Sequence, residues 1–109
     1  MHHNLVEFSS AFFHKADVTK WQDQVQLFKL ALEDVKRIDY VFANAGILES
    51  MYLGYTPAEK VEFVEPDLTT INVNVIGALY TCQLATQVFR TQDLVEGFRG
   101  KIVVTASVA

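Results

Sequence analysis

The sequence predicts an α/β fold built on a parallel sheet with crossover helices. Short apolar runs that end in small or polar residues alternate with longer segments of helical periodicity, which is the pattern of such a sheet. Half of the chain is hydrophobic and only 20% is charged, so it is not a disordered segment. A length of 109 residues accommodates one domain, which we assign to 1–109.

Charge and cysteine content exclude several classes of function. The net charge of -4 argues against a surface that binds nucleic acid, because such surfaces are usually basic. The single cysteine, Cys82, excludes an intramolecular disulfide and a cysteine-based zinc site, and it favours a reducing, cytoplasmic location. No stretch approaches the roughly 20 apolar residues of a membrane span. We therefore expect no nucleic acid, no membrane and no metal as partners.

The first predicted elements are a strand over Ala11–Ala16 and a helix that begins at Thr19. Thr19 and Gln22 have the spacing of a capping box, in which each side chain satisfies a backbone N–H at the start of a helix. Gln24 and the neighbouring polar residues lie off the apolar stripe of this helix. The stripe, with steps of three and four, consists of Trp21, Val25, Phe28, Leu32 and Val35.

Two further strands and one long helix complete the prediction. Ile38–Ala43 is a compact apolar run typical of a strand buried on both faces. The segment from Leu68 to about Thr91 contains many β-branched residues, but its length without a turn signal favours a helix, with Asp67 as N-cap. Lys101–Ala106 is predicted as a third buried strand.

Four short polar pieces follow or interrupt these elements. Asp17-Val18-Thr19 follows the first strand, Asn44-Ala45-Gly46 follows the second, and Thr105-Ala106-Ser107 ends the third. The fourth, Asn72 to Gly77, lies within the long helix. Ligands of doubly wound sheets bind outside the carboxyl ends of the strands, where three of the four pieces fall. We therefore predict a ligand site at that end of the sheet.

Together, in this order and spacing, the four pieces resemble the short-chain dehydrogenase/reductase family. The resemblance runs from about Phe12 to Ala109 and implies a partial, doubly wound Rossmann-type sheet with three strands and two main helices. It implies NAD or NADP as cofactor. By the same resemblance Asp17 would accept a hydrogen bond from the adenine amino group, and Val18 would lie beside the adenine ring. The residues passing close to the adenosine ribose would be Asn44, Ala45 and Gly46.

The resemblance also implies two catalytic residues and a substrate class. Ser107 corresponds to the serine that hydrogen-bonds the substrate oxygen, beside the nicotinamide. Asn74 corresponds to a helix asparagine associated with an ordered water in the proton relay. Asn72 is the competing choice, but Asn74 has Gly77 three residues later, as in the family's Asn-x-x-Gly. The reaction would interconvert a small alcohol and a carbonyl.

Two family motifs are missing from the sequence. No glycines form the phosphate-binding Gly-x-x-x-Gly-x-Gly, and no tyrosine is followed by lysine in Tyr-x-x-x-Lys. The chain therefore resembles an internal fragment, without the first two strands and the part after the serine, and we expect it alone to be inactive. The sheet neighbours of Ala11–Ala16 would be missing too. We expect a marginal, aggregation-prone chain, or one with that strand re-paired against Tyr40–Ala43.

Other interpretations remain open. A truncated, non-catalytic partner could associate with full-length subunits through the helix 68–91, which also suggests a homo-oligomer. An unrelated flavodoxin-like binding module is the other alternative. Softer cues, Phe-Ala-Asn-Ala-Gly-Ile and Asp-Val-Thr-Lys-Trp, suggest the branch that contains 15-hydroxyprostaglandin-dehydrogenase-like proteins.

Overall fold

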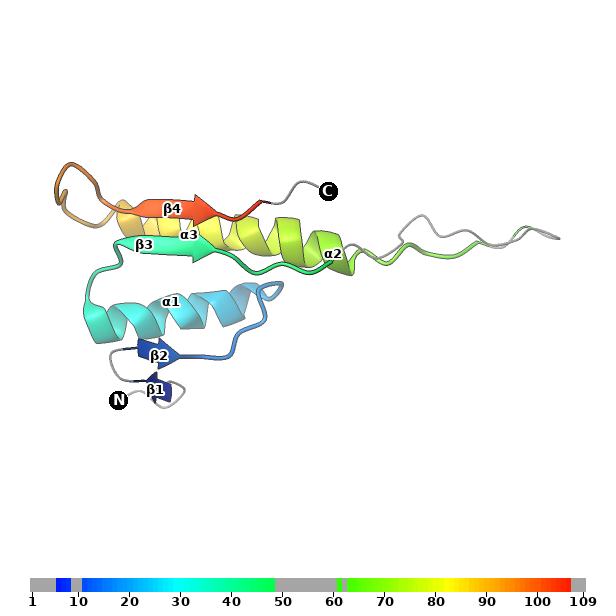
Figure 1. Cartoon of the computed structure of the whole chain (residues 1–109), viewed down its shortest axis with the longest axis horizontal. Coiled ribbons are helices and arrows are strands. Elements are labelled where there is room, and N and C mark those ends of the chain that lie inside the picture. Colours follow the sequence, from blue (N-terminus) through cyan, green and yellow to red (C-terminus); the bar gives the residue numbers. More distant parts are fainter. Residues whose placement is uncertain (1–5, 9–10, 49–60, 62, 107–109) are drawn as a thin grey trace.

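The structure contains two small sheets and two main helical segments (Figure 1). Strands β1 (Val6–Phe8) and β2 (Ala11–Phe13) pair antiparallel, whereas β3 (Tyr40–Ala43) and β4 (Lys101–Val104) pair parallel. This is a computed structural model, and it describes residues 6–8, 11–48, 61 and 63–106.

The parallel pair and its crossover helix confirm the predicted α/β class. The chain leaves β3, runs through the long helical segment and returns as β4, with Tyr40 opposite Lys101 and Ala43 opposite Val104. Its last helix, α3 (Ala78–Phe89), packs against both strands (Figure 1). This βαβ unit is part of a Rossmann-type fold.

The predicted placement of the first strand is wrong in two respects. β2 is shorter than Ala11–Ala16, and it pairs with β1 rather than joining the parallel sheet or pairing with β3. Its side chains are exposed, with Phe13 at 55%. The physical reason is proximity, because two residues separate β1 from β2, and an antiparallel hairpin needs only a short connection. The parallel sheet therefore has two strands within the described residues, not three.

Helix α1 (Trp21–Val35) is confirmed, but its predicted capping box is wrong. The N-cap is Lys20, and no side chain caps the helix there. Thr19 instead donates from its backbone N–H and its hydroxyl to Asp17 Oδ1, at 2.9 and 2.7 Å. The Asp17 carboxylate, two residues before Thr19, therefore occupies the hydroxyl that the capping box would need.

The predicted apolar stripe of α1 is confirmed at Trp21, Val25 and Phe28, which lie in or against the core, but not at Val35, which is 56% exposed. The buried residues of α1 are Gln24, Phe28 and Leu30. Among the described elements, α1 contacts α3, and none covers the C-terminal end of the stripe at Val35. Gln24, which the pattern left off the apolar face, is only 2% exposed.

The long helix is confirmed and contains a π-helical segment that the sequence did not predict. It runs through α2 (Thr69–Ile71), η1 (Asn72–Gly77) and α3. Leu68 is the N-cap, and Asp67 instead accepts the Thr69 N–H at 3.0 Å just before it. The β-branched residues are concentrated in α2 and η1, and the continuous helical segment outweighs their strand preference.

The core lies between α1, α3 and one face of the parallel pair. It is centred on Phe28, Leu84, Ala85 and Phe89, with Val41 and Ile102 packed against it. The prediction that β3 and β4 are buried on both faces is therefore wrong. Tyr40 and Phe42 point away from α3 and are 57% and 62% exposed, because no described element covers that face.

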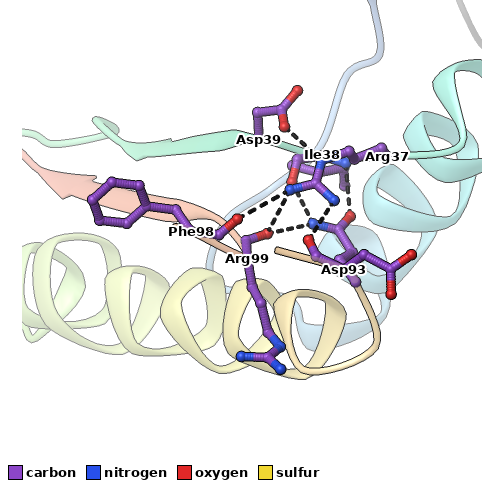
Figure 2. A network of polar contacts seen from close by, with 7 residues as sticks. Arg37, Ile38, Asp39, Asp93, Phe98 and Arg99 are labelled. Carbon is purple, nitrogen blue, oxygen red and sulfur yellow. Dashed lines mark hydrogen bonds and ion pairs between the residues drawn. The ribbon is translucent and has the colours of Figure 1, made fainter. Parts of the chain in front are cut away.

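A polar network joins the residues just before β3 and β4, at the end of the parallel sheet where both strands begin (Figure 2). Arg37 donates to Asp39 Oδ1 at 2.7 Å and to the Asp93 carbonyl at 2.8 Å, so it joins the loops before β3 and β4. The Gln92 side chain adds two hydrogen bonds, from the Ile38 N–H and to the Ile38 carbonyl, both at 2.8 Å. These contacts anchor the start of β3.

Candidate functional site

The ends of β3 and β4 lie at the same end of the molecule as the turn that precedes α1 (Figure 1). Asn44 follows β3 and Thr105 follows β4, and the Thr105 hydroxyl hydrogen-bonds Asn44 Oδ1. The Thr105 N–H also donates to the Ala43 carbonyl at 3.2 Å, which extends the ladder by one residue. The two polar strand ends are therefore in contact, as the doubly wound arrangement requires.

Asn74 holds the chain that follows the Asn44–Gly46 corner. Its Nδ2 donates to the Ile47 carbonyl at 2.9 Å, and its Oδ1 accepts the Ile47 N–H at 2.9 Å. A Cβ placed on Gly46 would lie 3.5 Å from Asn74 Oδ1, an ordinary contact distance. The η1 segment thus lies directly against the corner. Asn72, the competing choice, makes no side-chain hydrogen bond within the described part of the chain.

The Asp17 turn is organised by its own side chain. Hydrogen bonds from the Thr19 hydroxyl and then the Thr19 N–H lower the pKa of Asp17 below its ordinary value of 3.8. The Asp17 N–H in turn donates to Asp23 Oδ2 at 2.9 Å. Asp17 Oδ1 carries both Thr19 contacts, so Oδ2 is left without a hydrogen bond from the described residues. The turn presents an ionised, exposed carboxylate oxygen that can accept a hydrogen bond.

Val18 connects this turn to the same helical segment. A Cβ placed on Gly77 would lie 2.8 Å from Val18 Cγ2 and 3.3 Å from the Val18 carbonyl oxygen. Only glycine allows so close an approach without displacement. The Asp17–Thr19 turn therefore contacts η1 at Gly77, its last residue, and the Asn44–Gly46 corner contacts η1 at Asn74.

A cavity of about 630 Å³ extends from these turns along β3 and α1. Of the predicted site residues, Val18, Asn44 and Ala45 line it, whereas Asp17, Gly46 and Asn74 lie outside its wall. Ser107 lies outside the described residues. Further along, the wall is formed by Phe28, Ala31, Val41 and Ala43, which are apolar. Its volume is in the range of small-molecule sites.

These residues fit the adenosine half of a dinucleotide. Asp17 Oδ2, which takes no hydrogen bond from the described residues, could accept one from an amino group, and Val18 offers an apolar flank. The pyrophosphate half would need backbone N–H groups of a glycine-rich turn. The sequence contains no such motif.

The fold and the polar strand ends define a Rossmann-type α/β protein. Residues 2–109 match the short chain dehydrogenase family, and the chain belongs to this family. It is 40% identical over 105 residues to the short-chain dehydrogenase/reductase ascJ of Acremonium egyptiacum. The matched region covers 95% of this chain and 35% of ascJ.

Two other relatives show the same partial coverage. The short-chain dehydrogenase/reductase prx7 of Penicillium rubens is 34% identical over 106 residues, 93% of this chain and 37% of the relative. A diacetyl reductase of Staphylococcus epidermidis, described as (S)-acetoin forming, is 31% identical over 100 residues, 91% of this chain and 35% of the relative. The chain thus spans about a third of the length of these relatives.

The sequence did not reveal three groups that build the site. These are the Thr105 hydroxyl, which bonds Asn44, the Ile47 backbone, which pairs with Asn74, and the Gln24 amide, which the apolar pattern places off the buried face. Gln24 carried a weak signal, because it lies one position before Val25 of the stripe and seven after Asp17. The contact it makes depends on a helix more than 50 residues away, at Gly77.

The described residues contain neither a membrane-spanning helix nor a cluster of metal ligands. No helix among these residues is long and apolar enough to cross a membrane. No three His, Cys, Asp or Glu residues of this part of the chain group in a way that could hold a metal ion.

Proposed function

We propose that this chain is a segment of an NAD(P)-dependent oxidoreductase that interconverts an alcohol and a carbonyl. The proposal rests chiefly on the convergence of the Asp17–Thr19 turn and the Asn44–Gly46 corner on one helical segment, in a chain of the short-chain dehydrogenase family. The bound nicotinamide would supply or accept the hydride. The 15-hydroxyprostaglandin-dehydrogenase-like branch and the choice between NAD and NADP stay predictions.

The cofactor-binding residues of this proposal divide into two groups. Asp17 Oδ2 would accept from the adenine amino group, and Val18 would flank the ring from the cavity wall. On the other side of the site, the backbone of the corner would pass along the ribose. Its residues are Asn44, Ala45 and Gly46.

Asn74 and Ser107 would serve the reacting end. Ser107 would hydrogen-bond the substrate oxygen, and Asn74 would fix the helix backbone beside the corner through its pair with Ile47. A proton donor of the Tyr-x-x-x-Lys type is absent from the 109 residues. We therefore expect no turnover from this chain alone, and a single incomplete dinucleotide-binding domain over 1–109.

Nucleotide binding tests the proposal directly. Trp21, the only tryptophan, follows the Asp17 turn and has its ring 5.4 Å from that of Tyr80, so its fluorescence reports on the site. We expect adenosine, NAD and NADP to perturb it. Asp17→Ala should weaken adenosine binding about tenfold through the loss of one charged hydrogen bond.

The matched control is Glu33→Ala, which removes an exposed carboxylate from the far end of α1 and should leave the affinity unchanged. The absence of any adenosine binding would refute the nucleotide site. NAD(P)-dependent turnover of alcohols by the purified chain would refute the expected inactivity.

A second function is favoured by the exposed apolar side of the long helix. Ile71, Val75 and Leu79 recur every four residues and are 38%, 49% and 60% exposed. Such a stripe suits association with another subunit, either a second copy or a full-length relative. Co-purification with a full-length relative that is lost in Leu79→Lys, with no turnover gained, would support this function. Unchanged co-purification would exclude this face.

A further inference from the structure

Gln24 is the most deeply buried polar side chain of the described residues, at 2% exposed. Its Nε2 donates to the Val18 carbonyl at 2.7 Å and to the Gly77 carbonyl at 3.0 Å. Its Oε1 accepts the Thr81 hydroxyl at 2.7 Å. One amide therefore contacts the turn before α1, the end of η1 and the first turn of α3.

The orientation of this amide is dictated by its partners. Carbonyl oxygens only accept hydrogen bonds, so both hydrogens of the amide NH₂ are used, one on each carbonyl. A carboxylate at this position would face the same two oxygens without a proton to share. An apolar side chain would leave the part-buried Val18 carbonyl and the buried Gly77 carbonyl without this donor. Glutamine is thus the residue type that satisfies all three partners.

The contact lies between the two halves of the proposed site. Val18 belongs to the turn that carries Asp17, and Gly77 ends the η1 segment that carries Asn74. The approach is close, because a Cβ on Gly77 would lie 2.8 Å from Val18 Cγ2. A π-helical segment is rare and usually occurs as a single turn inside an α-helix. Gln24 provides a tertiary contact at the end of η1.

We infer that Gln24 is a positioning residue that fixes the Asp17–Thr19 turn relative to the η1 segment. It sets the spacing between the adenine side of the site and the Asn74–Ile47 pair. This inference rests on the proposed function for its consequence, nucleotide affinity, but its geometric part stands on the three hydrogen bonds alone.

Amide hydrogen exchange of the 109-residue chain tests the geometric part. Two hydrogen-bonded amides report on the two halves, since the Lys20 N–H donates to the Asp17 carbonyl and the Ile47 N–H donates to Asn74. The Lys36 N–H, bonded to the Leu32 carbonyl, reports on the far end of α1. In Gln24→Met we expect exchange about tenfold faster at both reporters and unchanged at Lys36.

Gln26→Met is the matched control, because it makes the same change at an exposed position of the same helix. It should leave all three amides unchanged. Faster exchange at Lys20 without a change at Ile47 would reduce Gln24 to a local support of its own helix. An equal increase at all three amides would mean general destabilisation. Either result overturns the inference. If Gln24→Met does not fold, Thr81→Val leaves Gln24 in place and removes the hydroxyl that contacts Gln24 Oε1 and the Gly77 carbonyl. It should shift the same two reporters, less strongly.

Titration with 5′-AMP tests the consequence. We expect Gln24→Met to weaken AMP binding about tenfold, and Gln26→Met to change it less than twofold. Leu84→Ala, a core variant remote from the turn, should lower stability with unchanged AMP affinity in the folded state. Equal losses in Leu84→Ala and Gln24→Met would overturn the positioning role. If the wild-type chain binds no AMP, the proposed function fails, while the exchange pattern still decides the positioning of the turn.

Discussion

Asn74 and Ile47 form a closed pair in which one side-chain amide satisfies both the N–H and the carbonyl of one backbone residue, each at 2.9 Å. The amide thus acts like a neighbouring strand for the segment that follows β3. This contact places the Asn44–Gly46 corner against the η1 segment, 27 residues further along the chain.

Asn74→Leu should release this segment. Both hydrogen bonds are lost, and we expect a loss of about 1–2 kcal/mol in the free energy of unfolding, because each net bond contributes about 1 kcal/mol. Asn72→Leu, in the same η1 segment but without a side-chain hydrogen bond, should have a much smaller effect. Urea denaturation followed by circular dichroism measures both. Equal losses in the two variants would show that the Ile47 pair contributes nothing specific.

Gly77 should tolerate no side chain. In Gly77→Ala the new Cβ would meet Val18 Cγ2 at 2.8 Å and the Val18 carbonyl oxygen at 3.3 Å. We expect a destabilisation of about 1–3 kcal/mol from overpacking. The double variant with Val18→Ala should recover part of the loss, because the nearest methyl group is removed. A double-mutant cycle by urea denaturation gives the coupling. Strictly additive effects would contradict a direct contact.

The Asp17 turn and the similar Asp67 turn make stability depend on pH. Thr19 lowers the pKa of Asp17, and Thr69 lowers that of Asp67, each below the ordinary 3.8. The folded state then binds protons less readily than the unfolded chain. The stability from these carboxylates is present above pH 3.8 and is lost as the pH falls through the lower, folded-state pKa values.

Thr19→Val should raise the pKa of Asp17 and leave that of Asp67 unchanged, because the valine lacks the hydroxyl donor. Thr69→Val should do the reverse, so each variant is the control of the other. Carboxyl carbon shifts in an NMR titration measure both values. If Asp17 keeps its lowered pKa in Thr19→Val, the Thr19 hydroxyl is not the cause of the lowered value.

Most of the elements and their order could be predicted from sequence, whereas strand β1 and the packing of the elements could not. Helix α1 and the long helix follow from periodicity and length, which are local properties. The exposure of Tyr40 and Phe42 depends on which elements cover the sheet, and an apolar strand looks the same whether one or both faces are covered. The pairing of β2 likewise depends on which partner strand is nearby.

The candidate site shows the same division. The pieces at Asp17 and Asn44 could be found because short motifs and strand ends carry them. The Thr19 capping box failed because Asp17, two residues earlier, is a competing acceptor that spacing alone does not weigh. Gln24 could not be assigned, since its burial comes from Gly77 and Thr81, which are distant in sequence.

Arg37 should stabilise the end of the sheet opposite the site (Figure 2). Arg37→Lys keeps the charge but loses the planar fork that reaches both Asp39 and the Asp93 carbonyl. We expect a loss of about 1 kcal/mol, mostly from the carbonyl contact, because the partly exposed ion pair contributes little. Arg90→Lys, at an exposed position, is the control. Identical thermal unfolding of the two variants would show that the Arg37 network does not contribute to the stability of the protein.

The free side of β3 should drive self-association of the isolated chain. The Lys101 and Thr105 N–H groups donate to the carbonyls of Asp39, just before β3, and of Ala43, so these residues and Val41 between them direct their backbone groups toward β4. The backbone groups of Tyr40 and Phe42 then face an edge that no described strand pairs with. Their rings, 6.4 Å apart and stacked, add an apolar surface beside that edge. Exposed edges with apolar side chains are sites of strand addition between copies.

A lysine on this strand should suppress the association. We expect sedimentation velocity to show concentration-dependent oligomers of the wild-type chain at micromolar concentrations, and mostly monomer for Phe42→Lys. Phe63→Lys is the matched control, because Phe63 is 96% exposed but lies outside every strand, so its loss should leave the oligomers in place. If Phe63→Lys dissolves the oligomers as well, general hydrophobicity drives the association. If the wild-type chain stays monomeric, the β3 edge is protected in solution.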